Sequence, residues 1–454
     1  KETALRTNVA AKPQSLNYEG TPVKTLNAEQ ELRRSVLACM LWEDGFYESG
    51  EDAAIRICAL VRKVGFDKTA ALAIEAREKM KLRHAPLLLA RELATMQAGR
   101  KMGDLLAAII QRPDELTEFL SLYWKDGKRP IAKQVKIGLA RALRKFNEYQ
   151  LAKYNRDSAI KLRDVLFLCH AKAQDAEQED LWKRLIADEL AQPNTWEELL
   201  SGGADKKATF THLILDGQLG ALAMLRNLRN MTESGVDDEV IRAGLSAMKV
   251  ERVLPFRFIA AAKYAPRFEP ELEAAMYRCL ADAPKLAGKT ALIVDTSPSM
   301  WMAKISAKSE MDRFEAAAAL AILCREVCEE VAVYAFNERG YEVAPRRGFG
   351  LRDALHKTQG NASCGGAAVA MANAAGYDRI IVLTDGQWHY SSVAGGRLDR
   401  EGDAKVIAPA PLTDKAYMIN VAALKNGVGY GKWKSIDGWS EAIIEYIRQA
   451  ETLN

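Results

Sequence analysis

The sequence predicts a chain in two parts, a helical-repeat half followed by an α/β half with a Rossmann-like, doubly wound parallel sheet. Through the first half, apolar residues recur with helical spacing in segments of about 8 to 20 residues, separated by short polar or Gly/Pro breaks. Beyond Pro284–Gly288, short β-rich apolar runs alternate with helical ones. Such alternation is typical of a parallel sheet that helices cover on both faces.

The helical half is expected to be a stacked array of helix pairs. Residues 1–27 carry no strong periodicity and are interpreted as an N-terminal arm, which ends at Asn27, a predicted helix N-cap. The helical domain then covers residues 28–286. Its clearest segments are Leu87–Met96, Leu105–Ile110, Leu116–Trp124, Leu139–Phe146, Val165–Cys169, Leu181–Leu190, Leu219–Leu228 and Val240–Met248. Many short helices in series are typical of HEAT or armadillo repeats, although no strict sequence period is present.

The α/β domain is assigned to residues 287–454. Its strand-like runs are Ala291–Val294, Val331–Phe336, Arg379–Leu383 and Ala416–Ala423, and its helical runs are Met311–Cys328, Leu351–Lys357, Ala367–Ala375 and Trp439–Ala450. In sheets of this kind ligands bind beyond the carboxyl ends of the strands. Residues that directly follow the strand-like runs are therefore the first candidates for a site.

The composition is that of an ordinary globular protein, 48% apolar and 27% charged. The seven cysteines form neither a Cys-x-x-Cys pair nor a zinc-binding spacing, which favours the reducing cytoplasm. No apolar stretch approaches the roughly 18 residues that a membrane span requires. The net charge of +4 is too small to indicate a class of binding partner, so the distribution of charge along the chain is the more informative property.

Three oxygen-bearing side chains follow the first strand-like run. Asp295, Ser297 and Ser299 alternate directly after Val294. One carboxylate and two hydroxyls can surround a hard cation such as Mg²⁺. Asp385 follows a later strand-like run, so we expect both carboxylates at the same rim of the sheet.

The spacing of Asp295, Ser297 and Ser299 resembles the metal-ion-dependent adhesion site (MIDAS) of von Willebrand factor A (vWA) domains. The resemblance implies that Asp385 completes the site, together with a Thr from a Gly-Gly-Thr loop. The matching loop here ends in Ala367, which removes one hydroxyl ligand, and water or Ser363 could replace it. We therefore predict a divalent metal, Mg²⁺, bound at uncertain occupancy. The alternative is that these side chains only cap the following turn.

Positive charge is concentrated between residues 121 and 172. This stretch holds 13 lysines and arginines against four acids, which gives it a net charge of +9. Several of the basic residues can share one helix flank while Leu139, Leu143 and Phe146 face inward. A surface of this kind is typical of a polyanion-binding site, and a solvated helix face is the alternative.

Longer stretches of the helical half resemble a known family. They are Gly127–Phe146, Gln150–Asn155, Leu162–His170, Leu225–Met231 and Leu254–Phe258. These stretches resemble the TROVE module, an RNA-binding module shared by the Ro autoantigen, telomerase-associated protein and vault proteins. A helical module followed by a vWA domain is the plan of Ro-family proteins, so the chain resembles a bacterial or phage Ro-like protein.

The resemblance implies a helical ring closed by the vWA domain. It implies binding of small structured noncoding (Y-like) RNA on the basic outer surface, entry of single-stranded ends of misfolded RNA into the hole, and a role in RNA quality control or processing. It further implies no catalysis and an exoribonuclease as a candidate partner. The RNA-contact candidates are Lys128, Arg129, Lys133, Lys136, Arg141, Arg144, Lys145, Lys153, Arg156 and His170. A lone His after an apolar run is otherwise more often a satisfied core residue.

Two other functions stay open. In the first, the chain is a metal-dependent protein-interaction scaffold whose vWA site grips a partner's carboxylate. In the second, it is a subunit of an enzyme assembly of the metal-chelatase kind, which also uses vWA domains. The sequence has no phosphate-binding loop, nucleophile elbow or zinc-protease motif, which argues against an autonomous enzyme.

Overall fold

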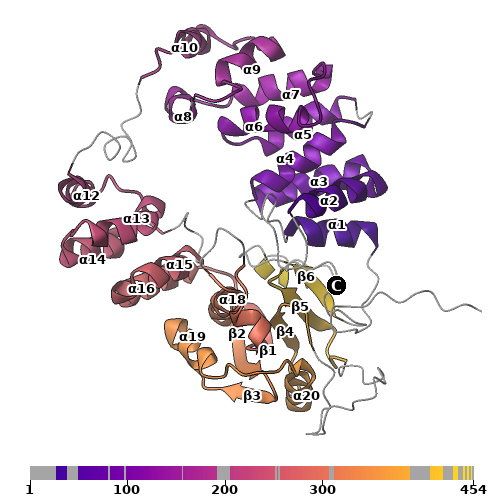
Figure 1. Ribbon diagram of the computed structural model, residues 1–454, viewed down its shortest axis with the longest axis vertical. Coiled ribbons are helices and arrows are strands. Elements are labelled where there is room, and N and C mark those ends of the chain that lie inside the picture. Colours follow the sequence, from indigo (N-terminus) through magenta and orange to yellow (C-terminus); the bar gives the residue numbers. More distant parts are fainter. Residues whose placement is uncertain are drawn as a thin grey trace, which may run out of the picture.

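The computed structural model of the chain shows helices arranged around a centre and closed by a β-sheet (Figure 1). The structure describes residues 27–37, 50–79, 82–96, 99–155, 157–191, 205–250, 253, 256–305, 311–388, 410–422, 433–437, 443–444, 447–448 and 451. The interpretation of residues 1–27 as an arm therefore lies outside the described residues except for Asn27, and most of the predicted helix Trp439–Ala450 does as well.

The first arm of the ring is a two-layered helical array. Its helices are α1 (Ala28–Leu37), α2 (Gly50–Val64), α3 (Phe66–Glu78), α4 (His84–Leu93), α5 (Lys101–Ile109), α6 (Asp114–Tyr123), α7 (Lys133–Leu143), α8 (Glu148–Tyr154), α9 (Leu162–Cys169) and α10 (Ala176–Ala187). Helices α1, α3, α5, α7 and α9 contact one another in succession, and so do α2, α4 and α6. This alternation between two layers is that of helical repeats and confirms the predicted class.

The second arm returns to the sheet. It contains α12 (Lys206–Leu215), α13 (Ala221–Glu233), α14 (Asp238–Ala247), α15 (Phe256–Tyr264), a 3₁₀-helix (Pro266–Phe268) and α16 (Glu269–Leu280). Helix α13 contacts α15, and α14 contacts both α12 and α16. At the ends of the ring, α1 contacts strand β6 (Lys434–Asp437), while α15 and α16 contact helices of the sheet domain (Figure 1).

A close helix crossing positions α7, which carries Lys133, Lys136 and Arg141. A Cβ atom on Gly138 of α7 would lie 2.8 Å from Leu106 Cβ and 2.9 Å from the Gly103 carbonyl oxygen of α5. Only a glycine lets two helices approach this closely without a shift. Leu139 and Leu143 of α7 are fully buried in the core beside this crossing. The helix is therefore anchored through its apolar face.

The sheet has six strands in the order β3-β2-β1-β4-β5-β6. The remaining strands are β1 (Leu286–Asp295), β2 (Cys328–Phe336), β3 (Gly340–Val343), β4 (Arg379–Thr384) and β5 (Lys415–Asn420). All neighbours are parallel except β2 and β3, which are antiparallel. The sequence had predicted neither β3 nor β6. Each has four residues and lies at an edge, too short for a periodic signal.

Helices cover both faces of the sheet, as predicted for a doubly wound fold. Leu292 and Val294 of β1 belong to a core that includes α18 (Arg313–Val327). Ala291 and Ile293 belong to a second core with α20 (Gly365–Ala375). Successive side chains of a strand point to opposite faces, so β1 is buried on both sides. The domain also contains α17 (Pro298–Trp301) and α19 (Gly348–His356).

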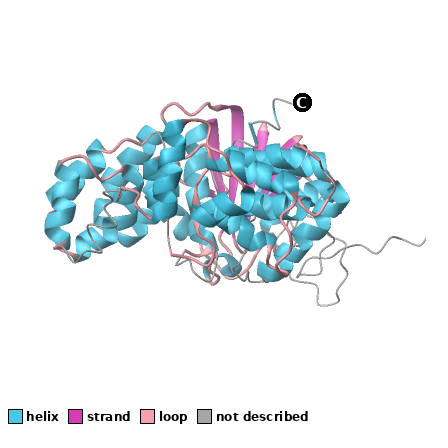
Figure 2. Ribbon diagram, turned by 90° about the horizontal axis from the view of Figure 1, so that it is seen from above, coloured by secondary structure: helices cyan, strands magenta, loops and turns pink. Residues whose placement is uncertain are grey.

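Seen from above, the strands form one group that has helices on both sides (Figure 2). Among the described helices, none combines the length and the apolar character needed to cross a membrane.

Candidate nucleic-acid interface and metal centre

The two predicted carboxylates lie at the same rim of the sheet. Asp295 ends β1 and Asp385 follows β4, and the two strands are paired so that Val294 lies opposite Leu383. Both carboxylates are fully buried. The Thr384 hydroxyl donates to Asp295 Oδ2 at 2.6 Å, and the Ser297 backbone N–H donates to Asp295 Oδ1 at 3.0 Å.

The two serines belong to the same cluster. Ser297 is the N-cap of α17, and its hydroxyl oxygen lies 3.4 Å from that of Ser299. The Ser299 hydroxyl in turn donates a hydrogen bond to the Asp385 carboxylate. The structure therefore brings together all four residues predicted to hold a metal.

An arginine that the sequence did not reveal also enters this cluster. Arg313 Nη1 donates to Asp385 Oδ2 at 2.9 Å, and the arginine side chain is only 2% exposed. Its position is fixed by a capping box at the start of α18, in which Asp312 and Glu315 each accept from the other's backbone N–H. The partners are 72 residues apart in sequence, so no local pattern indicates the pair.

The charges at the rim are not balanced. Burial and the neighbouring Asp385 carboxylate raise the pKa of Asp295 to about 7. Burial also raises the pKa of Asp385, while the Arg313 guanidinium opposes that shift. Two buried carboxylates thus meet at the rim while the Arg313 guanidinium contacts Asp385, and a second positive charge there would be favourable.

The oxygen ligands at the rim fit a hard divalent cation. Asp295, Ser297 and Ser299 would hold it, since carboxylate and hydroxyl oxygens are the ligands that Mg²⁺ accepts. Ala367 lies in α20 and supplies no hydroxyl. Ser363 was predicted as a replacement for the missing Thr, and its buried hydroxyl has no hydrogen-bond partner among the described residues. Among the described residues, no group of three or more His, Cys, Asp or Glu side chains could hold a metal ion, at the rim or elsewhere.

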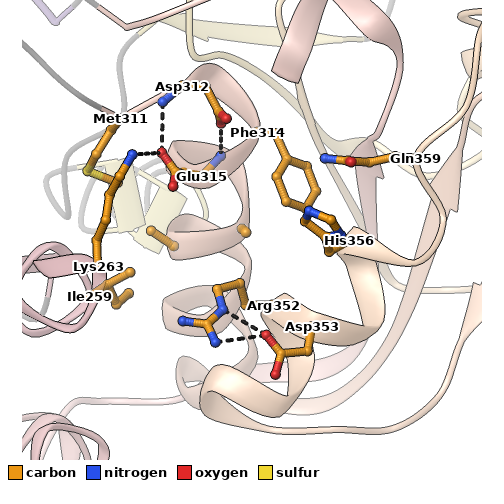
Figure 3. Close-up of a pocket in the computed structure, with 12 residues that line it drawn as sticks. Ile259, Lys263, Met311, Asp312, Phe314, Glu315, Arg352, Asp353, His356 and Gln359 are labelled. Carbon is orange, nitrogen blue, oxygen red and sulfur yellow. Dashed lines mark hydrogen bonds and ion pairs between the residues drawn. The ribbon is translucent and has the colours of Figure 1, made fainter. Parts of the chain in front are cut away.

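A cavity of about 240 Å³ lies where the second arm meets the sheet domain (Figure 3). Lys263 of α15 pairs with Glu315 of α18 at 2.7 Å. Arg352 of α19 pairs with Glu269 of α16 at 2.6 Å and with Asp353 at 2.8 Å. The Lys263–Glu315 and Arg352–Glu269 pairs join the second arm to the sheet domain.

Five of the predicted RNA-contact residues lie in α7, in α8 and in the loop between α6 and α7, at one end of the first arm (Figure 1). We refer to these five residues together as the basic surface: Lys128, Arg129, Lys133, Lys136 and Lys153. Within the described part of the chain, no carboxylate lies within ion-pair distance of their cationic groups. Lys136 reaches toward α9, where burial raises the pKa of Cys169 to about 12 and the lysine opposes that shift.

The acids of the same stretch are engaged elsewhere. Each contacts a partner that is not part of the basic surface, and two of these partners lie outside the stretch altogether. The contacts are Asp126 with Arg91, Glu148 with Arg184, Asp157 with Lys161 at 2.7 Å, and Asp164 with the Lys161 backbone N–H at 2.8 Å. None of these contacts therefore pairs an acid of the stretch with a residue of the basic surface.

Three further candidates make contacts that hold helices together. Arg144 Nε donates to the Lys172 carbonyl at 2.9 Å. Lys145 Nζ donates to the carbonyls of Ala107 at 2.6 Å and of Ile110, and burial lowers its pKa. Arg141 pairs with Asp104 at 2.6 Å. These groups join α7 to α5 and to the segment before α10, so each has a structural role whatever it binds.

The last two candidates have different outcomes. His170 is exposed and ends α9 in a left-handed conformation with a φ of 51°, so its interpretation as a buried core histidine is wrong. Arg156 lies outside the described residues. The RNA contacts themselves stay predictions.

Comparison with known proteins identifies the arrangement. The TROVE domain model matches residues 183–319, which run from α10 into α18. The crystal structure of the Deinococcus radiodurans Ro (RSR) protein superimposes with a TM-score of 0.61 over 93% of this chain and 98% of that chain, at 18% sequence identity. Residues 183–319 are thus similar to the TROVE domain family, and the chain has the fold of this Ro protein. The stretch Gly127–His170, which carried much of the sequence resemblance, lies outside the TROVE match. No curated protein sequence matches the chain.

Proposed function

We propose that this Ro-like protein binds RNA and does not itself catalyse a reaction. The observation that carries the proposal is the basic surface, whose five cationic side chains have no carboxylate partner among the described residues. Lysines and arginines without carboxylate partners are the groups that neutralise phosphates in a nucleic-acid interface. In the Ro-like fold, these residues belong to the first arm of the helical ring.

The RNA that we propose is small, structured and noncoding, of the Y-like kind that the family resemblance implies. Single-stranded ends of misfolded RNA would enter the ring, where shape and charge rather than base edges would select them. The role would be RNA quality control or processing in the cytoplasm, with an exoribonuclease as a partner recruited through the RNA. Sequencing the RNA that copurifies with the untagged protein tests this part, because enrichment of one small structured species is expected and random fragments would contradict it.

Charge deletion tests the basic surface itself. Each phosphate contact contributes about 0.7 to 0.9 to the slope of log affinity against log salt. Lys133→Ala/Lys136→Ala removes two contacts and should therefore weaken binding of a structured RNA about 10- to 30-fold at 0.15 M salt. The control is Lys68→Ala/Lys101→Ala, which removes two exposed lysines that are ion-paired with Glu29 and Asp67. Equal affinities for the two double variants would contradict the proposal.

A second candidate function is favoured by the carboxylate rim. We propose that Asp295, Ser297 and Ser299 hold a divalent cation, with Asp385 beside them, and that the cation leaves an open position for a partner protein's carboxylate. Pull-down of a protein partner that is lost in EDTA but persists after ribonuclease treatment would support this function. Pull-down that ribonuclease abolishes would assign the partner to the RNA instead.

A further inference from the structure

A pocket of about 850 Å³ opens beside the basic surface. One wall is the loop that follows α6, with Trp124, Lys128 and Arg129. The opposite wall is α9 and the segment before it, with Ile160 and Phe167. The two walls differ in chemistry, because the loop brings the cations and the α9 side brings mainly apolar groups.

The Phe167 ring, which lines this pocket, is not buried in the core of the helical array. Phe167 is 58% exposed, whereas Val165, Leu166 and Cys169 of the same helix are buried. The apolar run Val165–Cys169 had suggested a buried segment, but the helical turn places Phe167 on the opposite side from these neighbours. A large exposed aromatic group at the edge of an apolar pocket is typical of a binding site.

The loop is held in place by its own aromatic residues. The Trp124 indole N–H donates to the Arg129 carbonyl at 2.8 Å, and the Tyr123 hydroxyl donates to the Pro130 carbonyl at 3.3 Å. The turn at Gly127 has a φ of 118°, which a residue with a side chain rarely adopts. The loop therefore has a defined shape before any ligand arrives.

The same aromatic residues hold the cations at the pocket. The Lys128 ammonium lies 5.9 Å from the Trp124 ring centre, and the Arg129 guanidinium lies 4.2 Å from that of Tyr123. Both side chains belong to exposed residues. Positive charge is thus fixed at one edge of an apolar space.

The distribution of charge indicates the occupant. Asp164 lines the α9 side of the pocket and would repel a phosphate placed there, but its carboxylate can accept hydrogen bonds from amino groups. A ligand that fits has a flat ring with amino groups next to a negative charge. A nucleotide has these properties, because its base stacks on aromatic rings and its phosphate seeks cations.

We propose that this pocket takes one unpaired nucleobase of the bound RNA, stacked on Phe167, with the adjoining phosphate at Lys128 and Arg129. The inference rests on the proposed RNA binding and adds a contact to a base beside the contacts to phosphates. The protein therefore prefers RNA with an unpaired nucleotide over a fully paired RNA of equal charge.

The test compares two RNA probes on the full chain. The first is a hairpin with a single-stranded tail, and the second is the same hairpin with an abasic tail, which keeps every phosphate. Loss of one stacked base weakens binding about 5- to 150-fold. Phe167→Ala should lose this factor on the first probe, leave the second unchanged and keep the salt slope. Phe167→Tyr should restore most of the affinity.

Leu215→Ala is the matched control, since Leu215 is an apolar residue of α12 that is 67% exposed. Equal binding of the tailed probe by wild type and Phe167→Ala would overturn the pocket proposal. If Lys133→Ala/Lys136→Ala still weakened binding, RNA binding itself would stand. If Phe167→Ala lost the same factor of affinity on both probes, the pocket proposal would also be overturned, because stacking needs the base that the abasic tail lacks. If wild type bound neither probe, the proposed function and the pocket would fall together.

Discussion

The buried pair of Arg313 and Asp385 offers a sharp test of the carboxylate rim. Replacing Arg313 with Met keeps most of the side-chain volume and removes the charge. Asp385 would then lie buried beside Asp295 with no guanidinium at 2.9 Å. Breaking a buried pair by removing one partner costs about 3–5 kcal/mol, because it leaves an uncompensated charge.

This loss of folding free energy can be measured as a fall in the melting temperature. For a domain of about 150–250 residues, each kcal/mol shifts the midpoint by about 2–4 °C, so the transition of the sheet domain should fall by about 6–20 °C in EDTA. Magnesium at 100 times its Kd would return about 2.7 kcal/mol, or about 5–11 °C. Wild type should respond less, because Arg313 already supplies one positive charge.

The assay is thermal unfolding with EDTA and with saturating Mg²⁺. Arg325→Met is the control, since Arg325 belongs to the same helix and its guanidinium donates to the Arg346 carbonyl. An Arg313→Met midpoint within 2 °C (about 1 kcal/mol at most) of wild type in EDTA would refute the charge argument. Equal Mg²⁺ shifts in the two proteins would show that the arginine and the metal do not share the rim.

Three further changes test the packing of the ring and of the sheet domain. Glu115→Ala should lower the free energy of unfolding in urea by about 3–5 kcal/mol, because it leaves the buried Arg77 without the carboxylate that lies 2.7 Å from its guanidinium. Adding Arg77→Met should recover much of the loss. Gly138→Ala should cost about 1–3 kcal/mol in the same assay by overpacking the α5–α7 crossing, whereas a gain from helix propensity alone would contradict that crossing. Burial would raise the pKa of Glu451, but the ion pair with Arg379 outweighs it and lowers the pKa below 4.5. The stabilisation that Glu451 contributes is therefore present above pH 4.5 and is lost as the pH falls through the lower pKa of the folded state. Between pH 5 and 3, the melting temperature of Glu451→Gln should thus fall less steeply than that of wild type. Parallel curves of melting temperature against pH would contradict the ion pair.

Much of the sheet domain could be predicted because its strands are buried on both faces. Such strands appear as continuous apolar runs. Because parallel strands end at one edge of the sheet, the sequence predicts that Asp295 lies near Asp385. The short edge strands β3 and β6 escaped detection. The helical layers followed from periodicity, although only the structure gives the contacts between alternate helices.

The side-chain partners could not be predicted, since they come from distant parts of the chain. Arg313 reaches Asp385 across 72 positions, and Lys145 reaches carbonyls of another helix. A count of charges treats all lysines alike, whereas the structure separates those that bind backbone carbonyls from those of the basic surface. The exposure of Phe167 could not be predicted either, because an apolar run alone does not show which of its residues faces water.

The salt dependence of RNA binding tests the central claim most directly. The measurement is the slope of log affinity against log salt for wild type, for Lys133→Ala/Lys136→Ala and for Lys68→Ala/Lys101→Ala. If each residue of the basic surface neutralises one phosphate of single-stranded RNA, these contacts give wild type and the control a slope of about −3.5 or steeper, and Lys133→Ala/Lys136→Ala a slope that is shallower by about 1.4. A flat wild-type response, or the same slope in all three proteins, would contradict the account.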